Sequence, residues 1–227
     1  MKYFLDTEFI EGFNKPIFGK RRHFIDLISI GIISEDGRTY SAISNEYKYE
    51  DADSWVKENV IIPMYTKYVH GDERNMLDAN NFHKKYGKSN DTIAKEIINF
   101  INPCAELACK NYGSNKVNLD KHNYSQQLRA VQPEFYGYYC DYDWVLFCSL
   151  FGRMIDLPKG FPMYCIDLKQ MLDELAAHYF SLNTDNTLED RINALKGFSS
   201  YPKQSEEHDA LCDAKFNKDL YHFIKNK

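Results

Sequence analysis

The first fifty residues alternate between short apolar runs and turn-forming residues, a pattern typical of β-strands. Runs rich in aromatic and β-branched residues span 2–9, 24–33 and 39–45, and each predicts a strand. The Asp36-Gly37 pair lies between the second and third runs, and this dipeptide favours a tight hairpin turn. The sequence therefore predicts an antiparallel three-stranded meander at the start of the chain.

Beyond residue 50 the apolar positions recur mainly at helical spacing, with two further strand-like runs between them. The predicted helices span 52–59, 91–101, 142–151, 168–180 and 207–225, and the predicted strands span 134–140 and 162–167. Strands that alternate with helices favour an α/β fold in which helices flank a mixed sheet.

The organisation of the chain is expected to be simple. A length of 227 residues fits one domain with a sizeable core, so residues 1–227 are predicted to form a single domain. The stretch 103–131 has weak periodicity and many Asn, Lys, Ser and Gln residues. We expect it to be an insertion or a long excursion from the core.

Composition excludes some classes of protein. Hydrophobic residues make up 44% of the chain, but no run approaches the ~18 consecutive apolar residues of a membrane helix, and Asp6 and Glu8 interrupt the only segment that could resemble a secretory signal. We therefore expect a cytoplasmic protein with no membrane partner. None of the six cysteines lies in a CxxC pair, so reduced cysteines are expected in place of a zinc site or a disulfide framework.

The net charge of −5 argues against a protein that coats nucleic acid by bulk electrostatics. It leaves room for a local basic rim. One concentrated basic run, 15–23, contains Lys20, Arg21 and Arg22. The run is either a solvated loop or such a rim.

Two carboxylates lie close together in the first predicted strand. Alternate residues of a strand share a face, so Asp6 and Glu8 are expected on one face and Leu5, Thr7 and Phe9 on the other. Like charges this close are costly unless a cation lies between them, and hard oxygen ligands suit Mg²⁺ or Mn²⁺. The pair is either two solvated acids on an edge strand or half of a metal site.

Further acids lie where ligands gather in α/β folds. Asp143 follows the predicted strand 134–140 at its junction with a helix, and the carboxyl ends of such strands commonly form binding sites. The alternative is that Asp141 or Asp143 caps the helix. His208 and Asp213 flank the start of the last predicted helix, so both can face one pocket.

In their order and local context, Asp6, Glu8, Asp143, His208 and Asp213 resemble the DEDDh family of 3′–5′ exonucleases. That family includes polymerase proofreading exonucleases, ribonuclease T and oligoribonuclease. The tyrosine-bearing sister group would place Tyr four residues before the last acid, where this chain has Asp209, so the histidine branch fits better. The stretches 3–11, 26–31 and 208–214 are similar to a small bacterial exoribonuclease group typified by a mycobacterial polyadenylate-specific enzyme. This likeness is good over 1–48 and 134–220 and weaker between them.

The resemblance implies a ribonuclease H-like fold with a mixed five-stranded sheet, and a two-metal centre. Four carboxylates can hold two divalent ions about the scissile phosphate, one activating the attacking water and the other stabilising the leaving 3′ oxygen. The resemblance implies two Mg²⁺ ions, with Mn²⁺ as an alternative, bound by Asp6, Glu8, Asp143 and Asp213. Asp6 is expected to bridge both ions, with Glu8 and Asp213 on one side and Asp143 on the other. His208 is expected to be the general base.

The implied activity is the release of nucleoside monophosphates from the 3′ end of single-stranded RNA. Thr7 and Phe9 are expected to contact the terminal nucleotide, with Phe9 as a stacking platform or, alternatively, a core residue. The Lys20, Arg21 and Arg22 cluster is expected to meet upstream phosphates. A single-strand DNA exonuclease with the same centre and a non-catalytic nucleic-acid-binding module are the alternatives. Relatives are often homodimers, so a homodimer is expected.

Overall fold

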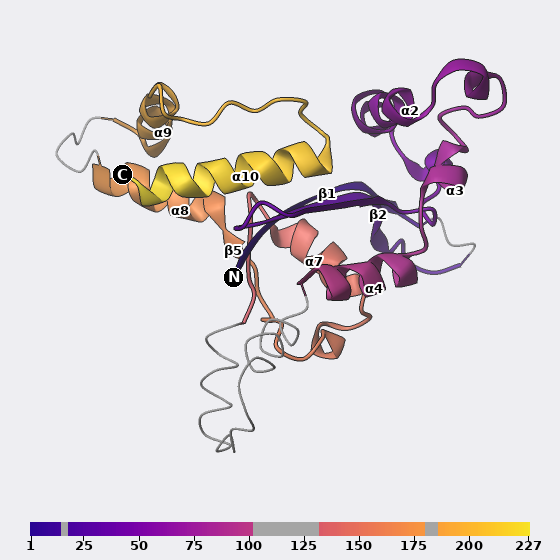
Figure 1. Cartoon of the computed structure of the whole chain (residues 1–227), viewed down its shortest axis with the longest axis horizontal. Helices are drawn as coiled ribbons and strands as arrows, with labels where there is room; N and C mark the ends of the chain where they lie inside the picture. The colour runs from indigo at the N-terminus through magenta and orange to yellow at the C-terminus, as the bar shows by residue number, and fades with distance from the viewer. Residues whose placement is uncertain (15–17, 102–131, 180–185) are drawn as a thin grey trace, which may run out of the picture.

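A five-stranded mixed sheet lies at the centre of the molecule (Figure 1). The computed structural model describes residues 1–14, 18–101, 132–179 and 186–227. The strands follow the order β3-β2-β1-β4-β5 across the sheet, with bounds β1 (Lys2–Phe13), β2 (His23–Ser34), β3 (Thr39–Ile43), β4 (Glu134–Gly137) and β5 (Ile166–Asp167). The first three strands pair antiparallel, whereas β4 and β5 run parallel to β1. The predicted meander and the predicted α/β class are confirmed, and the arrangement is consistent with a ribonuclease H-like fold.

The turn between β2 and β3 follows the sequence prediction. Gly37 has a φ of +92°, a backbone conformation that glycine adopts without strain. Its N–H donates to the Ser34 carbonyl at 3.0 Å, and the Ser34 N–H donates to the Arg38 carbonyl at 2.9 Å. The Asp36-Gly37 pair therefore closes the hairpin as expected.

The first two strands are longer than predicted and form a two-stranded arm. The register shifts between Glu8 and Phe9, and beyond this irregularity residues 9–13 pair with 23–27. Neither neighbouring strand reaches this far, because β3 pairs with 29–33 of β2 and β4 pairs with 2–4 of β1. We call residues 9–13 and 23–27 the arm.

Helices cover both faces of the sheet (Figure 1). On one face, α10 (Ala210–Lys225) runs along the strands, with α8 (Leu168–Tyr179) and α9 (Leu188–Lys196) packed beside it. On the other face lie α4 (Asn90–Ile101) and α7 (Asp141–Ser149). Successive residues of β1 alternate between these layers. Phe4 packs in the core beneath α8 and α10, whereas Tyr3 and Leu5 pack against the α4 and α7 side.

A third apolar core joins the arm to a group of short helices. Ile10 of β1 and Ile28 of β2 pack against buried residues of the segment 47–82, among them Val60, Ile61 and Phe82. From Tyr49 to Tyr86 the chain forms a series of short helical elements: η1 (Tyr49–Asp51), α1 (Ser54–Val56), the π-helical turn η2 (Lys57–Ile61), α2 (Ile62–Tyr68), η3 (Gly71–Asn75) and α3 (Phe82–Tyr86). A separate 3₁₀ turn, η4 (Met154–Asp156), follows α7. The predicted helix at 52–59 is thus the first part of a helical segment that continues to Tyr68.

A close approach of two backbones fixes the start of α10 over β2. A Cβ added at Gly31 would lie 2.2 Å from the Ala210 carbonyl oxygen, which no side chain can occupy. Further along, the Asn217 side chain donates to the Leu5 carbonyl at 3.0 Å in the buried interior. These two contacts hold α10 against β1 and β2 near the predicted acids.

Several predicted boundaries differ from the structure. The strand expected at 134–140 ends at Gly137 because the chain turns at Tyr139, whose φ is +53°. The strand expected at 162–167 is reduced to Ile166–Asp167. Helix α9 was not predicted. The expected insertion at 103–131 lies outside the described residues, and the single-domain organisation stays a prediction. In the described part of the chain, no helix has the length and apolar character needed to cross a membrane.

Candidate active site

The two acids of β1 point toward α10, as the strand alternation predicts. Asp6 lines a cavity together with Asp213 and Asn217 of α10. Glu8 is buried, with 9% of its surface exposed. Thr7, between them, contacts Asp143 of α7 on the opposite face. Asp6 and Glu8 therefore lie on one side of β1, whereas Thr7 points to the other side.

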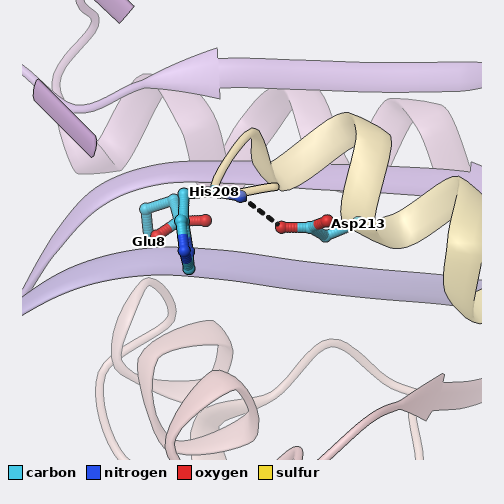
Figure 2. Close-up of side chains that lie close together, drawn as sticks. All are labelled: Glu8, His208 and Asp213. Atoms are coloured by element: carbon cyan, nitrogen blue, oxygen red, sulfur yellow. Dashed lines mark hydrogen bonds between the residues drawn. The ribbon is translucent and has the colours of Figure 1, made fainter. Parts of the chain in front are cut away.

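Glu8, His208 and Asp213 form the tightest group at this site. One ligand atom from each lies within 4.8 Å of the others. Figure 2 shows the Glu8 and His208 side chains together, with the backbone N–H of His208 donating to the Asp213 carboxylate. That hydrogen bond is 2.9 Å long, and Gln204 donates to the other Asp213 oxygen at 2.6 Å. Residues from a strand, a loop and a helix thus converge at one point.

The loop that carries His208 is held in an unusual backbone conformation. His208 has a φ of +67°, a region that non-glycine residues seldom occupy and that often marks functional sites. Its ring meets the Trp55 ring edge to face, with centroids 4.9 Å apart. Asp209 caps α10 through a 3.0 Å bond from the Cys212 N–H, and it pairs with Lys67 at 2.7 Å. Helices α1 and α2 therefore anchor this loop.

Asp143 lies in the first turn of α7 and is 6% exposed. Its Oδ1 accepts two hydrogen bonds from Thr7, one from the backbone N–H at 2.8 Å and one from the hydroxyl at 2.6 Å. The alternative in which Asp141 or Asp143 caps the helix is wrong, because the N-cap residue is Cys140. Asp143 instead links the start of α7 to the strand that carries the other acids.

Burial raises the pKa of all four acids, and repulsion from the other acids of the site adds to this for Asp6 and Glu8. Burial is the largest cause of the strongly raised pKa of Asp6, followed by the charges of Asp143, Glu8 and Asp213. Burial, then Asp213 and Asp143, raises the pKa of Glu8 to about 8. The four carboxylates are therefore electrostatically coupled, and their ionised forms are disfavoured together.

The other two acids are partly relieved by hydrogen bonds. Burial raises the pKa of Asp143 to about 6, although both bonds from Thr7 oppose the shift. Burial also raises the pKa of Asp213, against the bonds from Gln204 and His208. By contrast, the pKa of Asp209 is lowered, because the bonds from Lys67 and Cys212 outweigh its burial.

These properties fit a site for divalent cations. Within the described residues, no lysine or arginine forms an ion pair with Asp6, Glu8, Asp143 or Asp213. Oxygen ligands gathered without a protein cation suit a hard divalent ion, whose charge would reverse the repulsion. Asp6 and Asp143 lie outside the tight Glu8–His208–Asp213 group, so the donors are spread over more than one position.

The residues expected to bind substrate lie beside this centre or at the end of the arm. Phe9 is half-buried, and its ring meets the Tyr142 ring edge to face at 5.6 Å. It therefore serves partly as a core residue. Lys20, Arg21 and Arg22 are exposed in the segment before β2, and they do not line the acids' cavity. Their role, and that of Thr7 and Phe9 toward a ligand, stays a prediction.

Some residues of the site were not predicted from the sequence. Gln204 donates to Asp213, Trp55 packs on His208, and Lys67 anchors Asp209. Trp55 and Lys67 are far from the acids in sequence, and no local pattern connects them. Gly31 lies in one of the stretches that carry the resemblance, but its role depends on the approach of α10.

An α/β protein with four buried carboxylates and a histidine gathered around its central strand is of the class in which hydrolytic metal centres are common. No family model matches the sequence. The chain is similar to two proteins named 3′–5′ exoribonuclease, from Mycobacterium tuberculosis strains H37Rv and CDC 1551, each 26% identical to it over 215 residues. The alignments cover 95% of this chain and 88% of each relative. The similarity confirms the predicted resemblance to a 3′–5′ exoribonuclease family, and the wider DEDDh superfamily is consistent with it.

Proposed function

We propose that the protein is a divalent-metal-dependent 3′–5′ exoribonuclease that releases nucleoside monophosphates from the end of single-stranded RNA. The observation that carries this proposal is the convergence of Asp6, Glu8, Asp143 and Asp213 with His208, with the pKa of every acid raised. The similarity to two named exoribonucleases over most of the chain supports a hydrolytic enzyme. A module that only bound nucleic acid would gain nothing from four acids that repel a phosphate backbone.

The acids would hold Mg²⁺ or Mn²⁺. Asp6 would be shared between two ions, Glu8 and Asp213 would complete one side, and Asp143 would serve the other. When bound, two such ions supply charge stabilisation for both the attacking and the leaving oxygen of a phosphodiester displacement. Thr7 keeps Asp143 in place through its two bonds.

His208 would accept the proton of the attacking water. An imidazole nitrogen is the group that most often takes a proton in general base catalysis. The fixed backbone, the Trp55 ring and the bond to Asp213 limit how far the imidazole can move. The imidazole is thus held beside Glu8 and Asp213.

The experiment is a degradation assay with 5′-labelled single-stranded RNA and a DNA of the same sequence, in Mg²⁺, Mn²⁺ or EDTA. We expect a 3′–5′ ladder on RNA that vanishes in EDTA and in both Asp6→Ala and His208→Ala. Asp91→Ala, which removes an exposed acid of α4 on the face of the sheet opposite α10, is the control and should remain active. A ladder on DNA alone would establish the DNA exonuclease instead, and cleavage in EDTA or by Asp6→Ala would rule out the metal centre. A cytoplasmic location and a homodimer stay predictions.

A further inference from the structure

A file of four aromatic rings leads away from the acids along the arm. Phe9 meets Tyr142 at 5.6 Å, Tyr142 lies 6.1 Å from the His23 ring, and His23 lies 5.6 Å from Phe13. We call Phe9, Tyr142, His23 and Phe13 the aromatic file. It begins directly at the proposed centre, because Phe9 follows Glu8 and Tyr142 precedes Asp143 in the sequence.

Two rings of the file are exposed in a way that packing does not require. Phe13 is 60% exposed and Tyr142 is 41% exposed. The buried side of the arm already packs into the third core through Ile10 and, in part, Phe24. Exposed aromatic residues that form a continuous row commonly mark a binding surface.

Polar contacts fix the file in place. Glu11 pairs with the His23 ring at 2.8 Å, and the Tyr142 hydroxyl reaches the same carboxylate oxygen at 3.4 Å. Phe13 and His23 are also partners in the register of β1 and β2. The rings are therefore pre-organised, which lowers the entropy lost when a ligand binds them.

Positive charge lies beside the outer end of the file. Lys20, Arg21 and Arg22 directly precede His23 and are exposed, and among the described residues they form no ion pair. Aromatic rings beside a basic segment are the combination that holds single-stranded nucleic acid, by base stacking and by contact with phosphates.

Resting on the proposed exoribonuclease function, we propose that the aromatic file is the track for the nucleotides that precede the 3′ end of the RNA. The terminal nucleotide lies beside Phe9, and the earlier bases stack along Tyr142, His23 and Phe13. Five residues of strand, Phe9 to Phe13, span about 13 Å. If the bases keep the rise of about 3.4 Å that they have in a stacked helix, this length corresponds to roughly four nucleotides.

The binding test uses 5′-fluorescein-labelled RNA of eight nucleotides in EDTA, where no metal-dependent turnover interferes, and measures the dissociation constant by anisotropy. We expect Phe13→Ala to weaken binding about tenfold, since stacking on one ring contributes ~1–3 kcal/mol per base. Phe13→Tyr keeps a ring and should bind as the wild type does. Tyr164→Ala removes a ring that is 65% exposed outside the file and should also bind normally. Equal binding by Phe13→Ala and the wild type would overturn the proposal.

A second measurement separates a binding track from a merely structural residue. In Mg²⁺, Phe13→Ala should cleave a dinucleotide as well as the wild type does, yet show a raised KM and an unchanged kcat on the eight-nucleotide RNA. Equal losses on both lengths would mean that Phe13 only supports the fold, and would overturn the track. If the wild-type protein cleaves neither RNA, the proposed function fails, while the binding result still decides the track.

The contribution of the basic segment is tested by salt. Binding of single strands weakens with salt with a slope of about 0.7 for each phosphate contact. Replacing Lys20, Arg21 and Arg22 together by alanine should therefore lower the slope by about 2. An unchanged slope and an unchanged affinity would remove these three residues from the track.

Discussion

At the scale of single residues, the site depends on contacts that keep like charges close together. Thr7 is the clearest example, because its backbone N–H and its hydroxyl both donate to Asp143. Such bonds favour the ionised carboxylate and oppose the effect of burial on its pKa. In the proposed metal centre, Thr7 would therefore keep Asp143 ionised and in place.

Replacing Thr7 by valine tests this role. Valine has nearly the same shape but no hydroxyl, so the 2.6 Å bond to Asp143 is lost while the backbone bond remains. A bond to a charged group contributes ~1.5–3 kcal/mol, so we expect metal affinity, measured by Mn²⁺ titration calorimetry, to fall about tenfold or more. Thr7→Ser keeps the hydroxyl and serves as the control. An unchanged affinity in Thr7→Val would show that Asp143 needs no such support.

The residue scale also shows what the sequence could predict about the site. Asp6, Glu8, Asp143, His208 and Asp213 were found from strand alternation and from their positions at element junctions, both of which are local features. Gln204, Trp55 and Lys67 could not be found in this way, because each contributes through a contact that only the tertiary fold creates. The candidate ligands follow local patterns in the sequence, whereas the residues that contact and position them do not.

At the scale of elements, the placement of α10 is decisive, since it carries Asp213 and follows directly on the loop of His208. The helix approaches β2 so closely at Gly31 that any side chain there would meet the Ala210 carbonyl. Part of the geometry of the site therefore depends on one glycine far from the acids in the sequence.

Gly31→Ala should displace the start of α10. Overpacking of this kind costs about 1–3 kcal/mol, which in a chain of this size lowers the Tm by roughly 2–4 °C for each kcal/mol. We expect turnover of RNA to be lost at temperatures at which circular dichroism still shows a folded protein. Gly197→Ala, whose added Cβ would lie 3.3 Å from its nearest neighbour, should affect both properties less. A stable and fully active Gly31→Ala would show that the approach of α10 is not critical.

The elements also differ in how well the sequence predicts them. The β2–β3 hairpin was predicted because the Asp36-Gly37 turn is determined locally. Helix α9 was missed because it buries only Ile192 and Leu195, too few apolar positions for a clear period. Its start did carry a signal, since Thr187 and Asp190 form a capping box. The short β4 and β5 were overestimated because apolar runs do not reveal where pairing stops.

At the scale of the whole molecule, the buried acids of the site lower the stability of the folded protein when they are ionised. The pKa of Glu8 is raised from 4.5 to about 8, and that of Asp143 from 3.8 to about 6. An acid with a raised pKa binds protons more tightly when folded than when unfolded. Stability from these groups is therefore highest at low pH and is lost as the pH rises through the window from about 4 to about 8.

A pH series in EDTA tests this consequence. We expect the Tm of the wild-type protein to fall relative to that of Glu8→Gln as the pH rises from 5 to 8, because glutamine has no charge to lose. Mg²⁺ should raise the wild-type Tm more at pH 8 than at pH 6, since only ionised carboxylates bind it well. Comparison with Glu8→Gln cancels the titration of groups that lie outside the cluster of acids. A difference between the two proteins that is constant with pH would contradict the raised pKa of Glu8.

The measurement that tests the central claim most directly is the turnover of 5′-labelled single-stranded RNA in Mg²⁺ by Glu8→Gln, by His208→Gln and by the double variant. Groups that act as one centre give losses that are not additive. We predict that each single variant loses at least about 100-fold in kcat. The kcat of the double variant should be close to that of the less active single variant. Wild-type turnover by either single variant, or losses that multiply in the double variant, would contradict the view that these residues form one metal-dependent centre.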